Sequence, residues 1–191
     1  MPSSMGWSTG WRDGGLAVRL TGIEADAPPC ENAMNELSKI DPERKHPAHP
    51  PAVERCNRPV IIFLTVCSHQ RRRIFADNRV YQVLLESWSI AEQWHVGNFV
   101  IMPDHIHLFC SPARHDAESI TRWTAYWKRQ VSIRLPDLKP VWQRDCWDTQ
   151  LRGYENYETK WDYVRNNPVR AGLVRRAEDW PFQGVMNCLR W

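Results

Sequence analysis

The hydrophobic pattern becomes regular at residues 60–67, where β-branched and aromatic residues form the continuous run VIIFLTVC. Its length and composition predict a strand buried on both faces. The next segment, residues 77–97, has apolar residues at the three- and four-residue spacing of an amphipathic helix. We expect this helix to begin at Asp77 or Asn78 and to end at Gly97. Its apolar positions are Val80, Val83, Leu84, Trp88, Ala91 and Trp94.

A β-hairpin and a second helix follow along the chain. The segments NFVIM at 98–102 and HIHLFC at 105–110 have strand composition, and the Pro-Asp pair at 103–104 favours a tight turn. The two segments are therefore expected to pair as antiparallel strands. From 118 to 135 the apolar residues again follow helical spacing, until Pro136 stops the helix.

Two more elements complete the pattern. Residues 141–151 predict a short fourth strand or an irregular edge, and Asn156 can cap a last helix that ends near Asn166 because Pro168 disfavours its continuation. The resulting order is β-α-β-β-α-β-α. The sequence thus predicts an α+β fold, a ferredoxin-like β-α-β-β-α-β antiparallel sheet with an added C-terminal helix.

The first 58 residues have a different composition. They contain 7 of the 14 prolines and 5 of the 9 glycines, and their 7 Lys and Arg against 8 Asp and Glu leave a net charge of −1. The stretch DPERKHPAHPP at 41–51 holds too little apolar surface to offset the entropy of ordering it. We predict that residues 1–58 form a poorly ordered extension.

Charge and cysteine usage narrow the class of protein. The net charge of +3 excludes a polybasic DNA binder, so any contact with nucleic acid must come from a local patch. No run of roughly 18 apolar residues predicts a membrane helix, and the first residues lack a secretory signal pattern. The six cysteines form no C-x-x-C pair, which favours buried reduced thiols over a zinc ribbon. We expect a cytoplasmic protein with no membrane partner.

Two histidines share one face of the predicted strand at 105–110. Side chains at i and i+2 of a strand point the same way, so His105 and His107 lie together on the side opposite Ile106, Leu108 and Cys110. This predicts a solvated face of the hairpin that carries an imidazole pair. Such a pair can bind a metal ion, although H-x-H also occurs for structural reasons.

The last predicted helix carries a candidate nucleophile. Tyr163 and Asn167 are four residues apart and so are expected on one helical face. A tyrosine can act as a covalent nucleophile when a cation or base favours its phenolate, and an amide can complete a metal-ligand set. On spacing alone, a half-buried structural tyrosine and a helix-terminal asparagine are the favoured interpretation.

Four sequence segments distinguish these alternatives by their resemblance to a known family. In order and spacing, IMPDHIHLF, VWQRDCWD, YETKWDYVRNNPVRAGLV and EDWPF are similar to the REP-associated tyrosine transposases, a branch of the single-tyrosine HUH (His-hydrophobic-His) endonucleases. The resemblance covers residues 59–184, which we take as a catalytic domain, and leaves residues 185–191 as a C-terminal tail.

The resemblance implies a role for each matching residue. His105 and His107 would hold one divalent ion, Mg²⁺ or Mn²⁺, Tyr163 would be the nucleophile, and Asn167 would be a third ligand. The implied reaction is a transposase cleavage of single-stranded DNA folded into imperfect hairpins of the repetitive palindromic type, through a 5′-phosphotyrosine link. The protein would act as a monomer or homodimer. Two rival functions are a catalytically silent hairpin-DNA-binding module and a metal-dependent hydrolase with a structural tyrosine.

Local cations and aromatic residues are the candidates for DNA contact. We expect contacts from Arg71, Arg72 and Arg73 after the first strand, and from Arg122, Lys128 and Arg129 on the outer surface of the second helix, although such charges often form only a solvated face. Of the 11 tryptophans, those on the helix faces predict core packing. Trp142, Trp147 and Trp161 remain candidates for stacking on an unpaired base, or for packing.

Overall fold

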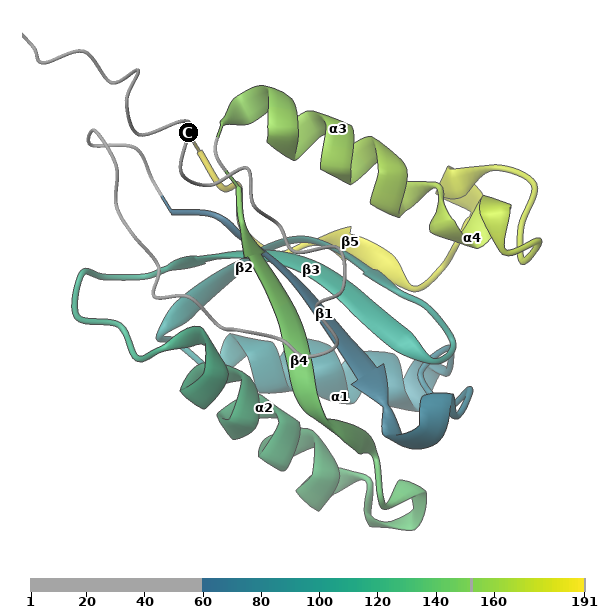
Figure 1. The fold of residues 1–191 in the computed structure, drawn as a ribbon. Coiled ribbons are helices and arrows are strands. Elements are labelled where there is room, and N and C mark those ends of the chain that lie inside the picture. Colours follow the sequence, from purple (N-terminus) through teal and green to yellow (C-terminus); the bar gives the residue numbers. More distant parts are fainter. Residues whose placement is uncertain (1–59, 152, 191) are drawn as a thin grey trace, which may run out of the picture. The chain divides into compact units, whose positions relative to one another are not determined.

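The computed structural model describes residues 60–151 and 153–190, which form a five-stranded antiparallel sheet with helices on both faces (Figure 1). The predicted extension at 1–58 lies outside the described residues. The strands, in spatial order β4-β1-β3-β2-β5, are β4 (Trp142–Gln150), β1 (Ile62–Ser68), β3 (His105–Pro112), β2 (Trp94–Ile101) and β5 (Gln183–Val185). The helices are α1 (Asn78–Ser89), α2 (Ile120–Arg134), α3 (Tyr154–Arg165) and the single turn α4 (Asn167–Arg170).

This arrangement confirms the predicted α+β fold and the predicted order of its elements along the chain. The first four strands have the antiparallel order of a split β-α-β unit, and β5 adds a short fifth strand against β2. The sequence did not predict β5, because three residues are too few to show a strand period. Next to the pairing of β5 with β2, the buried indole of Trp180 donates to the carbonyl of Ile101 in β2 at 3.0 Å. In the described residues, no helix has the length and apolar character needed to cross a membrane.

One face of the sheet carries α1 and α2 and the larger of two cores. Four tryptophans from the helices and from β2 meet there, with ring centroids 5.9–6.1 Å apart along the series Trp88–Trp127–Trp123–Trp94. The indole of Trp123 donates to the carbonyl of Ala91 at 2.7 Å, which ties α2 to the end of α1. Core packing, as predicted, therefore accounts for the tryptophans of the helix faces.

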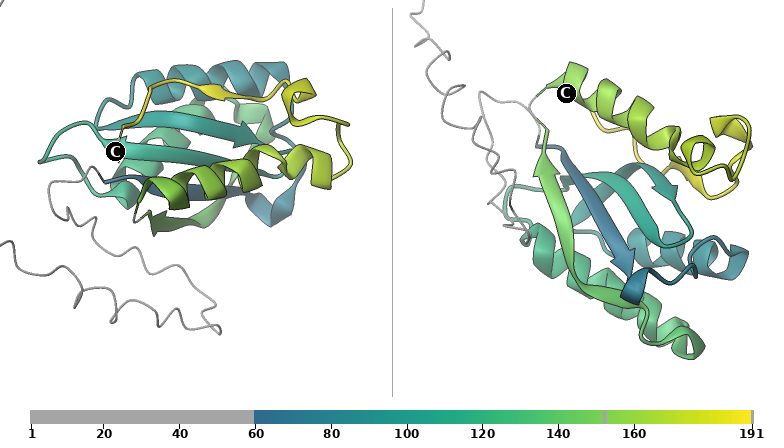
Figure 2. Two further views of the ribbon diagram at one scale, coloured as in Figure 1. Left: turned by 90° about the horizontal axis from the view of Figure 1, so that it is seen from above. Right: turned by 45° about the vertical axis from the view of Figure 1, so that its right-hand side comes forward.

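The opposite face carries α3 and a second, smaller core (Figures 1 and 2). Val100 and Phe109 project from the sheet, while Tyr157 and Val164 project from α3 toward them. The side-chain amide of Asn98 donates to the hydroxyl of Tyr157 at 2.7 Å. The prediction that this face of the hairpin is solvated is therefore wrong for much of its area, because α3 covers it.

Three predicted boundaries differ from the structure. The first helix ends at Ser89, and Gly97 lies inside β2, where the pairing register with β3 shifts. Helical spacing predicted too long a helix, because Trp94 fits that spacing but reaches the same core from β2. Asn156 lies within α3, which begins after Gly153 without a side-chain cap.

Candidate active site

The histidine pair occupies the start of β3 on the face that α3 covers. The Nε2 atoms of His105 and His107 approach to 3.1 Å. The Nδ1 atom of His105 lies 2.7 Å from a carboxylate oxygen of Asp104, and the Nδ1 atom of His107 lies 2.9 Å from the hydroxyl of Thr65 on β1. These partners fix both rings so that their remaining nitrogens converge, as in the ligands of protein metal sites.

The environment keeps both imidazoles neutral. Burial lowers the pKa of His107 to about 3, and the nearby charges of His105, Arg71, Lys160 and Arg170 act in the same direction. Burial also lowers the pKa of His105, against the opposing hydrogen bond of Asp104. At neutral pH each ring therefore keeps one lone pair for a ligand.

This donor set fits a divalent ion. Two ligands at about 2.1 Å and at a right angle to each other are roughly 3.0 Å apart, close to the observed Nε2 separation. In the part of the chain that the structure describes, no third His, Cys, Asp or Glu joins the pair. Among the residues that the structure describes, a third protein ligand would therefore be another oxygen donor, such as an amide.

Arg71 holds Asp104, the carboxylate that contacts His105. The residue follows β1 in a left-handed backbone conformation, with φ values of 54° at Gln70 and 56° at Arg71. Its Nε lies 2.7 Å from Asp104, and its Nη1 donates to the sulfur of Cys67 at 3.0 Å. The side chain remains 54% exposed, so the predicted contact with a DNA phosphate stays open to it.

The other two arginines of the triplet differ in position. Arg72 donates to the carbonyls of Leu138 and Pro140 and thereby joins the β1–α1 connection to the loop before β4. Arg73 is exposed. Of the triplet, only Arg71 contacts the residues that orient the histidines.

Tyr163 lies near the end of α3 and is 60% exposed. The guanidinium of Arg170 lies 3.9 Å from the centre of the Tyr163 ring and donates a hydrogen bond to the side-chain oxygen of Asn167. Arg170 thus links the candidate nucleophile to the candidate third ligand.

The expected shared helical face of Tyr163 and Asn167 is not what brings them together. The helix α3 ends at Arg165, and Asn167 begins the separate turn α4, which has Pro168 in its first turn. Pro168 lacks the backbone donor and restricts the residue before it, which accounts for the break. In the described residues, neither Tyr163 nor Asn167 makes a hydrogen bond to the histidine pair.

Two cations join the site from the C-terminal helices. The ammonium of Lys160 lies 5.3 Å from the centre of the Phe63 ring, and this ring stacks on His107 at 5.3 Å. The charges of Lys160 and Arg170 both lower the pKa of His107, after the larger effect of burial. Sequence reasoning missed both residues. The signal for Arg170 was its place three residues after Asn167, within one helical turn.

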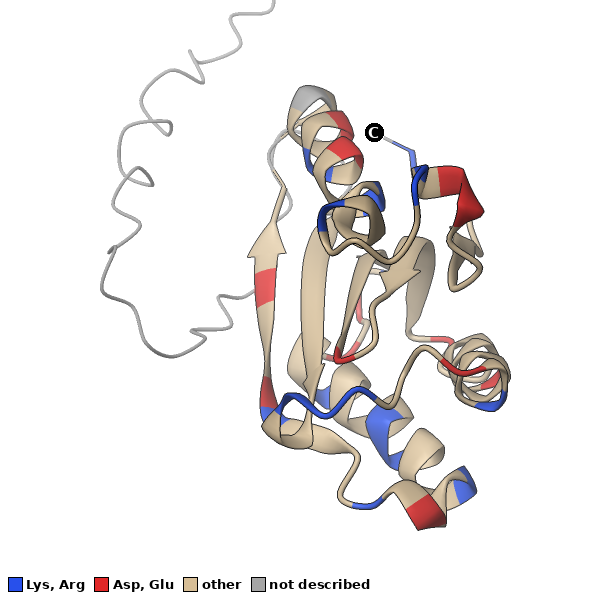
Figure 3. Ribbon diagram, turned by 90° about the vertical axis from the view of Figure 1, so that its right-hand side faces the viewer, with Lys and Arg blue, Asp and Glu red and all other residues tan. Residues whose placement is uncertain are grey.

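The cations predicted on the second helix lie elsewhere. Arg122 and Arg129 are exposed but belong to α2, on the sheet face opposite the histidine pair, and Figure 3 shows cationic residues on both sides of the sheet. The predicted surface position of Lys128 is wrong. Its ammonium is buried and donates to the carbonyls of Gln143 and Arg144 at 2.8 and 3.3 Å. Burial lowers the pKa of Lys128.

Trp161, the predicted aromatic contact, packs edge-on against Phe109 at 6.0 Å and is partly buried. A stacking role would therefore have to use the part of its indole that Phe109 leaves uncovered.

Replacing Lys128 should lower stability. Lys128→Ala removes two charge-assisted hydrogen bonds and the contact of the ammonium with Trp142, so we expect the free energy of unfolding to fall by about 2 kcal/mol. Urea denaturation measures this change. The matched control Arg129→Ala, on the exposed side of the same turn, should stay within about 0.5 kcal/mol of the wild type. Equal stability of the two variants would contradict a structural role for Lys128.

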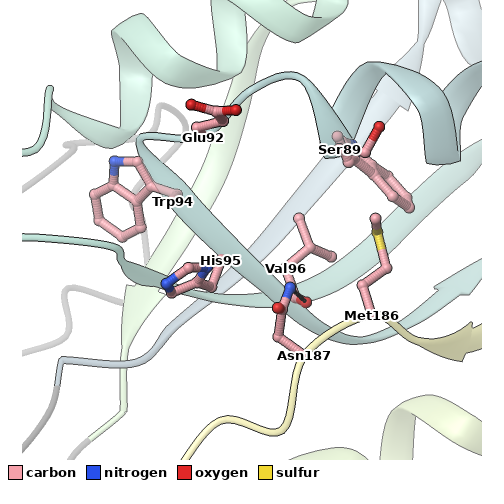
Figure 4. A pocket seen from close by; sticks show the side chains of 8 residues that line it. Ser89, Glu92, Trp94, His95, Val96, Met186 and Asn187 are labelled. Carbon is pink, nitrogen blue, oxygen red and sulfur yellow. Dashed lines mark hydrogen bonds between the residues drawn. The ribbon is translucent and has the colours of Figure 1, made fainter.

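A separate hollow of about 340 Å³ lies at the other end of the sheet (Figure 4). Trp94, His95 and Met186 line it, and Asn187 donates from its side chain to the carbonyl of Val96. Trp94 pairs with the last residue of β3, whereas the histidines begin that strand. The hollow is therefore not part of the candidate site.

Known proteins resemble this chain in sequence and in fold. No family model matches the chain. A curated REP-associated tyrosine transposase from Escherichia coli (strain K12) is 30% identical over 123 residues, which cover 63% of this chain and 73% of that protein. A relative from Haemophilus influenzae, named after the same transposases, is 32% identical over 95 residues, or 43% of this chain and 53% of the relative.

A solved structure shares the fold. It is described as a REP-associated tyrosine transposase bound to a REP hairpin, and it superposes with a TM-score of 0.58 at 21% identity, over 73% of this chain and 81% of that one. The similarity in sequence covers more than two thirds of the Escherichia coli protein. The chain belongs to the family of REP-associated tyrosine transposases.

Proposed function

We propose that this protein is a metal-dependent endonuclease and strand transferase that cleaves hairpin-containing single-stranded DNA with Tyr163 as the nucleophile. The observation that carries the proposal is the convergence of the two neutral imidazoles at 3.1 Å on the face covered by the tyrosine-bearing helix. Family membership supports transposition as the reaction class, and the solved neighbour is described as bound to a REP hairpin.

His105 and His107 would hold Mg²⁺ or Mn²⁺, with the amide oxygen of Asn167 as the proposed third protein ligand. A bound ion would supply polarisation of the scissile phosphate. Imidazole ligands favour Mn²⁺ by softness, while availability would decide between the two metals. The side-chain oxygen of Asn167 accepts a hydrogen bond from Arg170, and its second lone pair would serve as the ligand.

The proposed reaction is a transesterification. The Tyr163 oxygen forms a bond to phosphorus while the bond from phosphorus to the 3′ oxygen breaks, and the departing 3′ oxygen takes a proton to become a hydroxyl. The 5′-phosphotyrosine ester conserves the phosphodiester energy, so attack by a 3′-hydroxyl can rejoin the strand without another energy source. Lys160, Arg170 and Arg71 supply the positive charge that attracts the phosphate backbone.

A covalent-adduct assay tests this proposal. The full chain is incubated with end-labelled hairpin oligonucleotides that carry single-stranded flanks, with Mn²⁺ or Mg²⁺, and then denatured. We expect a protein–DNA band that survives denaturant and disappears when a chelator is added first. Cleavage without an adduct would indicate the hydrolase, and binding without cleavage would indicate the silent module. Either result would reject the proposal.

Arg170 is expected to position the nucleophile. Arg170→Ala removes the cation that stacks on the Tyr163 ring, so the rate of adduct formation at saturating DNA should fall roughly 10- to 100-fold through loss of orientation. Single-turnover kinetics measure this rate. Arg170→Lys should recover part of it.

The matched control for Arg170 is Arg165→Ala. Arg165 is an exposed arginine at the end of α3 that pairs with Asp162 instead of contacting Tyr163. It should retain the wild-type rate. A purely electrostatic contribution from Arg170 would instead weaken DNA affinity and leave the saturated rate unchanged, which contradicts a positioning role.

A further inference from the structure

The edge strand β4 presents an indole on the same face as the histidine pair. Trp147 pairs with Thr65, and Thr65 pairs with His107. Residues directly opposite each other in neighbouring strands share a face, so Trp147, Thr65 and His107 form one row across the sheet. The hydrogen bond between Thr65 and His107 confirms this direction for the inner two.

Trp147 differs from the tryptophans of the cores. Its side chain is 42% exposed, whereas Trp88, Trp123 and Trp127 are at most 2% exposed. The helix α3 packs over β2 and β3 through Tyr157 and Trp161, and β4 lies at the sheet edge on the far side of β1. Within residues 60–151 and 153–190, the structure gives the Trp147 ring no aromatic or hydrogen-bonding partner.

A cation lies close to the His107 end of this row. Lys160 extends from α3 over Phe63 of β1, and Phe63 stacks on His107. Adjacent strands are about 4.8 Å apart, so Trp147 is roughly 10 Å from His107 across two strand spacings. A few nucleotides of single strand can span this distance, with a phosphate near Lys160.

We propose that Trp147 is a stacking platform for one unpaired base of the substrate strand, close to the cleaved phosphate. The inference rests on the proposed function, because it names how the same site holds its DNA. The Trp147 side chain is uncharged and 42% exposed, so a base is the part of the nucleotide that suits this surface. Aromatic side chains bind unpaired bases in this way with little sequence preference.

Fluorescence anisotropy with a dye-labelled hairpin oligonucleotide and its single-stranded flank tests the platform. Trp147→Ala should weaken binding roughly ten-fold, and Trp147→Phe should recover most of the loss because it keeps an aromatic face. The matched control is Tyr126→Ala, which removes a comparably exposed ring, 44% exposed, from α2 on the opposite face. It should bind like the wild type.

An abasic scan of the flank identifies the partner base. At one position, removal of the base should weaken binding by the wild type roughly ten-fold and leave binding by Trp147→Ala unchanged. Circular dichroism melting checks that the variants are folded. Suppose that Trp147→Ala binds the oligonucleotide within two-fold of the wild type, and that no abasic position weakens binding by the wild type alone. The stacking platform is then overturned, while the proposed function stands. If the folded wild type binds no single-stranded flank and forms no adduct, both are overturned.

Discussion

Tyr163→Phe should abolish the covalent protein–DNA adduct while leaving the fold and DNA binding intact. The substitution removes only the phenolic oxygen, and the phenylalanine ring can still stack beneath the guanidinium of Arg170. Because the side chain is 60% exposed, the hydroxyl contributes little to stability. Loss of a covalent nucleophile should reduce adduct formation roughly a thousand-fold or more. Gel analysis of denatured, end-labelled reactions measures this directly.

The chain offers a matched control for that experiment. Tyr154, in the first turn of α3, is 61% exposed, and Tyr154→Phe should form the adduct at the wild-type rate. An undiminished adduct in Tyr163→Phe would assign the nucleophile to another residue. Cleavage that continues without an adduct would assign the attack to water and make Tyr163 structural.

His107→Ala should remove both metal binding and cleavage. The substitution deletes one of the two converging Nε2 atoms, and a single imidazole with an amide oxygen is a weak site. We expect the affinity for Mn²⁺ to fall at least about 100-fold by isothermal titration, and DNA cleavage to fall in parallel. Reading out metal binding without DNA separates a ligand role from a contact with substrate.

His95→Ala is the control for the metal titration. His95 is an exposed histidine of β2 that pairs with Ser111, near the far end of β3 from the histidine pair. Its removal should leave both the Mn²⁺ affinity and the cleavage rate unchanged. Equal Mn²⁺ affinity in His107→Ala and the wild type would reject the histidine pair as the metal site.

The fold was predictable in segments where the apolar residues follow a single spacing, either that of a strand or that of a helix. The alternation at His105 and His107 placed both side chains on one face, and the apolar stripes of α1 and α2 placed Trp88 and Trp127 in the core. The end of α1 was not predictable in this way, because Trp94 fits the helical spacing by chance while belonging to a strand. Periodicity reports which residues are buried, and several backbone paths can bury the same residues.

The candidate site was less predictable than the fold, because it depends on which sheet face each helix covers. Helical spacing predicted that Arg122 and Arg129 face outward, which is correct. However, α1 and α2 both pack on the sheet face away from the histidines. Lys128 shows a second limit. A long side chain at the border of an apolar stripe can turn inward when carbonyl acceptors lie within its reach.

The order of the two layers along the chain has a consequence for biosynthesis. The four strands and two helices that carry the histidine pair lie within residues 60–151, whereas α3 and α4, with Tyr163 and Arg170, come afterwards. A chain emerging from the ribosome therefore exposes the complete imidazole pair, and the apolar surface around Phe109, before the tyrosine is available. Translation thus adds the proposed nucleophile only after the strands that carry the proposed metal ligands, and packing of α3 on the sheet brings the two parts of the candidate site together.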